Sequence, residues 1–169
     1  MRMLRHILLI VLALHLQTSW VHKIAISGIK PNLVLIVLVY IGISSGQITG
    51  TVFGFFSGFL VDIYAAPVSM GIHTLANAVV GFAVGYSRIG VVAEDLRVQV
   101  LTLFLASALH SLIYFALDAV LNPALAFSFM LYSGVATACY TACVGLALCL
   151  LLAVRFDGGL HLDVRRLYG

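Results

Sequence analysis

The chain has 169 residues, of which 63% are hydrophobic and only 9% are charged, and its formal net charge is +3. Soluble domains carry roughly 25% charged residues, so this composition argues against a soluble domain and indicates a polytopic membrane protein. The small net charge gives no indication of nucleic-acid binding. One helical bundle accounts for the whole length, so we expect a single integral membrane domain over residues 1–169.

Six apolar runs are candidates for membrane segments, because a bilayer presents about 30 Å of hydrocarbon to cross. They occupy approximately residues 4–21, 31–45, 47–63, 71–88, 98–117 and 129–156. The second and third runs are short and meet at the polar turn Ser44-Ser45-Gly46-Gln47, so they are either two thin spans or a re-entrant hairpin. The pattern predicts an all-α bundle of about six transmembrane segments.

The first run follows Arg2 and Arg5 and therefore resembles a secretory signal in its charge pattern. Signal cleavage needs small residues, whereas the end of this run contains Gln17, Thr18 and Trp20. We therefore expect a retained first membrane segment.

Basic residues are distributed unevenly between the two sides that six segments would create. One side carries seven arginines, and the other carries only Lys23 and Lys30. The seven are Arg2, Arg5, Arg88, Arg97, Arg155, Arg165 and Arg166. By the positive-inside rule, both termini and residues 89–97 are expected in the cytoplasm.

Small and polar residues recur every four positions in the third and fourth runs. These residues are Gly50, Gly54, Gly58 and Asp62 in the third run, and His73, Asn77, Gly81 and Gly85 in the fourth. Such rows let two membrane helices approach backbone to backbone, and helix packing is their simplest interpretation. A short loop joins the runs, so we expect an antiparallel hairpin. The predicted pairs are Asp62 with His73, Gly58 with Asn77, Gly54 with Gly81, and Gly50 with Gly85.

Polar residues gather in the outer half of the predicted bundle, where ionisable groups are costly and usually face the interior. Asp62 and His73 form either a structural pair that closes the hairpin or a contact site for a partner, with catalysis the least expected role. The candidate partner-binding residues are Asp62, His73, Asn32 and Lys30, and the other intramembrane polar residues are His15, His110 and Asp118. For the lone histidines, hydrogen-bonded packing is the favoured interpretation.

Enzyme motifs do not occur in the sequence: there is no serine-hydrolase elbow, zinc-protease helix or P-loop. Asp62, Ser69 and His73 are close in sequence, but nothing arranges an oxyanion hole around them. Cys139 and Cys143 share a helix face with small residues and form neither a disulfide framework nor a metal-site pattern. We expect a non-enzymatic protein without a metal or cofactor.

Four stretches between residues 31 and 88 are specific when their order and spacing are taken together. They are Pro31-Asn32 with the apolar run to Tyr40, the glycine-rich run ending Leu60-Val61-Asp62, the stretch Pro67 to Leu75 with Gly71 and His73, and Gly81 with Gly85. Together they resemble the MreD family, the integral membrane subunit of the bacterial rod-shape-determining system. MreD proteins often have Pro-Asp where this chain has Pro31-Asn32, so a charge there is not required or is supplied differently.

The resemblance implies a non-enzymatic subunit of the cell-elongation complex in the bacterial inner membrane. It implies MreC, a protein with one span and a periplasmic domain, as partner, together with MreB filaments, the glycosyltransferase RodA and its transpeptidase. It also implies a fold similar to the substrate-binding subunits of energy-coupling-factor vitamin transporters. The alternative function is therefore a small-molecule-binding transport subunit. Those subunits usually carry Ala-x-x-x-Ala in the first span, whereas residues 4–21 contain only Ala13. The sequence leaves open a homodimer and the binding of a lipid or wall precursor in the bundle.

Overall fold

A computed structural model describes residues 2–21, 23, 25, 29–64, 70–87, 96–121 and 126–156. Within them the chain forms six helices, which coincide with the six predicted runs except for a few residues at the ends. The helices are α1 (Arg2–Ser19), α2 (Leu33–Ser45), α3 (Gln47–Ile63), α4 (Ile72–Ser87), α5 (Leu96–Leu121) and α6 (Ala126–Phe156). The predicted all-α fold is confirmed.

Helix length differs greatly along the chain. Among the described residues, one helix is long and apolar enough to cross a bilayer, the Val98–Asp118 part of α5. Shorter apolar helices cover Met3–Ser19, Leu33–Ser45, Gln47–Ile63 and Ser133–Leu148. With 13 residues, α2 extends only about 20 Å, less than the hydrocarbon thickness of a bilayer. Whether α2 and α3 are thin spans or a re-entrant hairpin remains a prediction.

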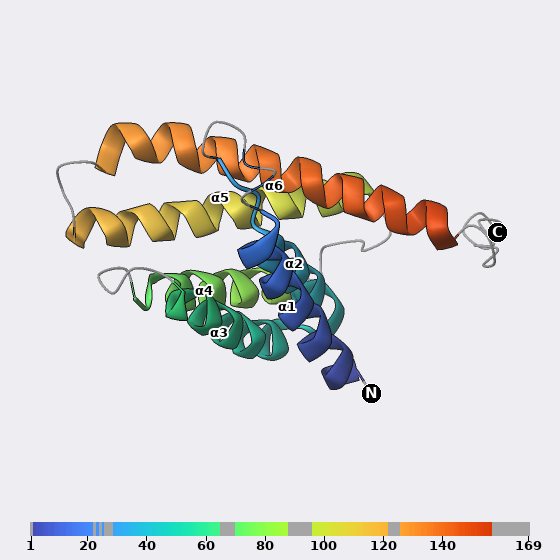
Figure 1. Cartoon of the computed structure of the whole chain (residues 1–169). Coiled ribbons are helices and arrows are strands. Elements are labelled where there is room, and N and C mark those ends of the chain that lie inside the picture. Colours follow the sequence, from blue (N-terminus) through green and yellow to red (C-terminus); the bar gives the residue numbers. More distant parts are fainter. Residues whose placement is uncertain are drawn as a thin grey trace.

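Two antiparallel helix pairs dominate the arrangement. Figure 1 shows α5 and α6 side by side as a long pair, with α3 and α4 below them as a shorter pair and α1 crossing obliquely. The end of α3, the start of α4, the end of α5 and the start of α6 lie at the left of the view. The start of α1 and the end of α6 lie at the right. In both pairs, the end of the first helix and the start of the second therefore lie on the same side of the molecule. This side is opposite the start of α1 and the end of α6.

The core is built around α2, which contacts each of the other five helices. A helix that is apolar on all sides is expected to be largely buried, and most of α2 is buried or half-buried, although Tyr40 is exposed. Its residues Val34, Leu35, Leu38 and Ile41 are completely inaccessible. The central cluster continues into α4 and α5 through Val80, Val84, Leu103 and Ala106.

Polar groups from three helices hold the start of α2. Asn32 caps the helix, because its Oδ1 accepts a hydrogen bond from the Leu35 N–H at 3.0 Å. Near the end of α1, the Gln17 Oε1 accepts a hydrogen bond from the Leu33 N–H at 2.8 Å. The Asn32 backbone N–H donates to the Thr141 hydroxyl of α6 at 3.1 Å. These bonds join α1, α2 and α6 at one level of the bundle.

The polar turn between α2 and α3 is reduced to one residue outside the helices, Gly46. Its φ of 87° lies in the left-handed region that favours glycine. The Gly46 N–H donates to the Gly42 carbonyl at 2.9 Å, and the Gly46 carbonyl accepts from the Gly50 N–H at 2.9 Å. The turn therefore satisfies backbone groups of both helices while it reverses the chain.

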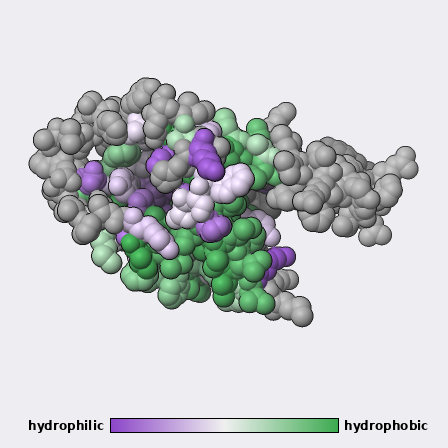
Figure 2. Space-filling view, viewed as in Figure 1, coloured by the Kyte–Doolittle hydropathy of each residue, from purple (hydrophilic) through white to green (hydrophobic). Residues whose placement is uncertain are grey.

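The surface over α1 and α3 is strongly apolar. Figure 2 shows a broad hydrophobic area in the lower part of the view, where these two helices lie in Figure 1. Exposed apolar side chains on them include Leu4, Leu8, Phe55, Phe56 and Phe59. Soluble monomers rarely expose a continuous apolar patch of this kind, whereas a membrane protein presents it to lipid.

Candidate functional site

The contact between α3 and α4 is the most extensive helix contact in the described part of the chain. Glycines make it possible. A Cβ atom on Gly54 would lie 2.8 Å from the carbonyl carbon of Asn77, and one on Gly58 would lie 2.6 Å from the Cα of Thr74. Real Cβ atoms essentially never approach closer than 3.0 Å. The two backbones are therefore in direct contact, with no room for a side chain between them.

The pairing of this α3–α4 seam is offset by one helical turn from the predicted pairing. Gly50 faces Gly81, Gly54 faces Asn77, and Gly58 faces His73. The predicted pairs are therefore wrong: Gly50 with Gly85, Gly54 with Gly81, and Gly58 with Asn77. Gly85 instead faces Gln47 at the start of α3. A four-residue spacing defines the contacting face of each helix, but it does not define how far one helix is shifted along the other.

Asp62 lies at the end of the seam and is only 2% exposed. Its Oδ1 accepts a hydrogen bond from the His73 backbone N–H at 3.1 Å. Its Oδ2 accepts bonds from the Thr74 backbone N–H at 2.8 Å and from the Thr74 hydroxyl at 2.5 Å. The first N–H groups of a helix lack partners within the helix, and the helix dipole favours a negative charge beside them. Asp62 on α3 thus caps α4 and closes this end of the hairpin.

Asp62 and His73 are in contact as predicted, but the carboxylate binds the backbone of His73 and not its imidazole ring. The carboxylate binds the backbone N–H of His73, while the imidazole packs against α5. The His73 ring stacks on His110 with centroids 5.6 Å apart and on Tyr114 with centroids 4.8 Å apart. Tyr114 in turn makes an edge contact with Phe115 at 5.5 Å. One short segment of α4 therefore connects the acid of α3 with a ring cluster on α5.

Two buried polar atoms near this cluster have no hydrogen-bond partner among the described residues: the Nε2 of His110 and the Oδ1 of Asn77. His110 is 7% exposed and Asn77 is 1% exposed. Leaving a buried polar atom unpaired costs about 1–3 kcal/mol. Among the described residues, His110 packs by ring stacking on His73 and Tyr114, and its Nε2 makes no hydrogen bond.

Sequence reasoning missed two residues of this arrangement, Thr74 and Tyr114. Thr74 supplies two of the three hydrogen bonds to Asp62, and Tyr114 contacts both histidine rings. A hydroxyl in the first turn of the fourth run and an aromatic residue one turn after His110 were the available signals. Neither is specific without knowledge of the neighbouring helix.

The other predicted polar residues do not join Asp62, His73 and His110. His15 and Lys30 are exposed, and Asp118 is half-buried near the end of α5. Asn32 is occupied as the cap of α2. Three of the predicted polar residues therefore form one cluster, and a role of the other four in partner binding stays a prediction.

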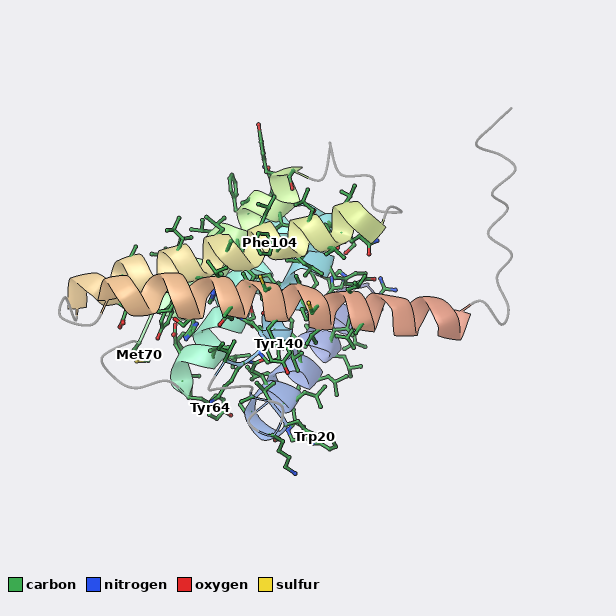
Figure 3. All side chains as sticks on the ribbon, turned by 90° about the horizontal axis from the view of Figure 1, so that it is seen from above. Trp20, Tyr64, Met70, Phe104 and Tyr140 are labelled. Atoms are coloured by element: carbon green, nitrogen blue, oxygen red, sulfur yellow. The ribbon has the colours of Figure 1, made fainter. Side chains whose placement is uncertain are left out.

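A groove of about 310 Å³ opens beside the α4 cap. It is lined by Phe55, Phe59 and Asp62 of α3 and by Met70, Gly71, Thr74, Leu75 and Ala78 at the start of α4. We call this the Asp62 groove. Figure 3 shows Met70 and Tyr64 at the same end of the bundle, with Trp20 separate from them at the end of α1. The groove thus combines one buried carboxylate with exposed aromatic and aliphatic walls.

Comparison with protein families matches the chain to the model described as rod shape-determining protein MreD, over residues 1–157. The matched range includes all six helices, from the start of α1 to the end of α6. Searches of curated proteins and of solved structures returned no match.

Proposed function

The chain belongs to the MreD family, and from this membership we propose that it binds MreC as a subunit of the bacterial cell-elongation complex. Membership implies a rod shape-determining role in the cell-elongation machinery, and the family is non-enzymatic. The proposed task is to help couple MreB filaments to peptidoglycan synthesis by RodA and its transpeptidase. The single observation that carries the proposal is the family match over residues 1–157.

The chain is a membrane protein by its family, and we place it in the bacterial inner membrane with both termini in the cytoplasm. The arginine and lysine asymmetry supports this orientation. In Figure 1 the start of α1 and the end of α6 lie opposite the ends of α3 and α5, which supports a common side for both ends of the helical region. In this orientation the Asp62 groove lies on the side where wall synthesis occurs.

Polar residues of the hairpin are used mainly for internal structure, which suits a binding subunit better than a catalyst. Asp62 caps α4, and Asn32 caps α2. The similarity to vitamin-transporter subunits remains a prediction, and the transport alternative gains no specific observation from the fold.

We propose that the partner-binding surface includes the four residues Asp62, His73, Asn32 and Lys30. Lys30 is exposed and available for direct contact, whereas Asp62 is a buried carboxylate at the base of the groove. His73 and Asn32 position the helix starts next to them. The surface would then combine an acid at the end of α3 with a base in the segment before α2.

Purification of the tagged protein from its native membrane in mild detergent, followed by mass spectrometry, tests the proposed function. An MreC-like protein with one membrane span should be the most enriched partner, with RodA or MreB at lower yield. Recovery with ATPase subunits instead would contradict the proposal and support a transporter.

A further inference from the structure

One acceptor position of the Asp62 carboxylate has no hydrogen-bond donor among the described residues. A carboxylate offers about four lone-pair sites. The three hydrogen bonds from α4 use one site on Oδ1 and two on Oδ2. The remaining site is on Oδ1, and Asp62 lines the groove.

Within the described part of the chain, only the start of α4 compensates the negative charge of Asp62. The start of a helix contributes the equivalent of roughly half a positive charge. Among the described side chains, Asp62 bonds to α4 alone and to no lysine or arginine. A buried carboxylate at a membrane border is costly unless it is paired. The groove therefore carries a surplus of negative charge at its base.

The walls of the Asp62 groove fit a cation on an apolar stem. Phe55 is 49% exposed and Phe59 is 44% exposed, and aromatic faces attract ammonium and guanidinium groups. Leu75 and Met70 provide apolar surface for the methylene groups of such a side chain. A partner side chain that ends in a carboxylic acid or an amide would gain little binding energy from this groove.

The α4 side of the groove fits a helix. Gly71, Thr74 and Ala78 line it at spacings of three and four residues, and small residues at this spacing allow close approach of another membrane helix. A lipid chain does not need such a surface, because it adapts to large side chains equally well.

We propose that the Asp62 groove receives a lysine or arginine side chain at the outer end of a membrane-spanning helix of a partner protein. The proposal rests on the proposed function, since it names the chemistry by which the partner is held. An ethanolamine headgroup and the exposed Lys23 or Lys30 of a second copy are other cations that could reach the carboxylate, and the experiment separates them.

Photo-crosslinking in the native membrane tests the proposal on the full-length tagged protein. A photoreactive amino acid is placed at Leu75, and the matched control is placed at Phe82. Both residues lie on α4 and are 50% exposed, but only Leu75 lines the groove. The crosslink yield of position 75 with one partner protein should be at least about tenfold higher than that of position 82. The crosslinked position in the partner should lie within two helical turns of a lysine or arginine. Equal yields, or crosslinks to lipid, to a second copy or to a peptide without a basic residue, would overturn the proposal.

The role of charge is tested with Asp62→Asn, measured per amount of folded protein after size-exclusion chromatography. The crosslink at position 75 should fall about tenfold, which corresponds to about 1.4 kcal/mol. Thr74→Val is the control, because it removes one hydrogen bond to Asp62 without changing the charge, and its crosslink per folded protein should stay within about twofold of wild type. An equal loss in both variants would show a folding effect and contradict the proposal.

The two proposals can fail separately. If an MreC-like protein is purified with the chain but position 75 does not crosslink to a basic helix, only the groove proposal is wrong. If position 75 crosslinks to a basic helix of a protein unrelated to wall synthesis, the groove proposal stands and the proposed function is wrong.

Discussion

The α3–α4 and α5–α6 pairs are oriented alike, but their glycines have different neighbours. In the α3–α4 seam, a Cβ on Gly54 or Gly58 would meet backbone atoms. In the α5–α6 pair, a Cβ on Gly134 would lie 3.3 Å from the ring of Phe115, and one on Gly145 would lie 2.6 Å from the Cδ1 of Leu103. Backbone atoms cannot move without shifting a helix, whereas a side chain can change rotamer. Glycine is therefore required in the first pair and replaceable in the second.

The same difference separates a fixed region from an adaptable one. The seam holds α3 and α4 at a defined offset, and this offset places Asp62 at the start of α4. Between α5 and α6 there is instead an apolar crevice of about 140 Å³ whose walls include Phe104 and Phe115. Figure 3 shows Phe104 on the α5 side of this pair. We expect changes in the first pair to affect the groove and changes in the second to be absorbed locally.

Cysteine labelling tests whether the end of α3 and the end of α5 lie on the same, outer side of the membrane. Each position should either react with an impermeant reagent or not react at all. In a variant without native cysteines, Tyr64→Cys at the end of α3 and Asp118→Cys near the end of α5 should react with an impermeant reagent from outside. Tyr64 is 70% exposed, and Asp118 is half-buried. A cysteine at Glu94, which lies outside the described residues, should not react in intact cells. Labelling at position 94 would disprove the orientation.

Among the substitutions, Gly54→Leu and Gly81→Leu should have the largest effect. Overpacking usually costs 1–3 kcal/mol, and here a side chain must separate two backbones, so we expect a loss of at least about 3 kcal/mol. The yield of folded protein after detergent extraction measures this. Val79→Leu, on the exposed face of α4, is the matched control. Similar yields for all three variants would remove the case for backbone contact.

Asp62→Ala should have the next largest effect, because α4 loses its cap. Removing a helix cap typically costs about 0.5–2 kcal/mol, and three hydrogen bonds are lost here. Thr74→Val removes only the hydroxyl bond to Oδ2 and should cost about 1 kcal/mol. Thermal unfolding in detergent compares the two. If Asp62→Ala is no worse than Thr74→Val, the cap is not what stabilises this end of the hairpin.

Gly145→Ala should have the smallest effect, because its new methyl group meets only the flexible end of Leu103. We expect a change within about 1 kcal/mol in the same thermal assay, compared with a much larger loss for Gly54→Ala. A loss at Gly145 as large as that at Gly54 would erase the distinction between the two pairs.

The sequence predicts the helices well and their mutual offset poorly. All six runs become helices, because length and uninterrupted hydrophobicity are properties of each segment alone. The glycine rows on α3 and α4 also identify the two contacting faces. Their offset depends on the connection between the helices and on side chains such as Thr74, which the four-residue spacing does not contain. The predicted pairing was therefore wrong by one turn.

The candidate site shows the same limit. Asp62 and His73 were predicted to meet, and they do, but through the backbone of His73. The ring instead packs on His110 and Tyr114, because these residues lie on α5 at the level of the α4 start. No spacing within α4 could indicate a contact with a helix that begins more than twenty residues later.

Cell shape is the property that the proposed role controls. When the chain is depleted from its native cells, the ratio of cell length to width should fall toward about one as rods become round. A wild-type copy and a Gly145→Ala copy should restore rods, whereas a Gly54→Leu copy should not. Cells that keep their length-to-width ratio after depletion would contradict the assignment of this chain to the rod-shape machinery.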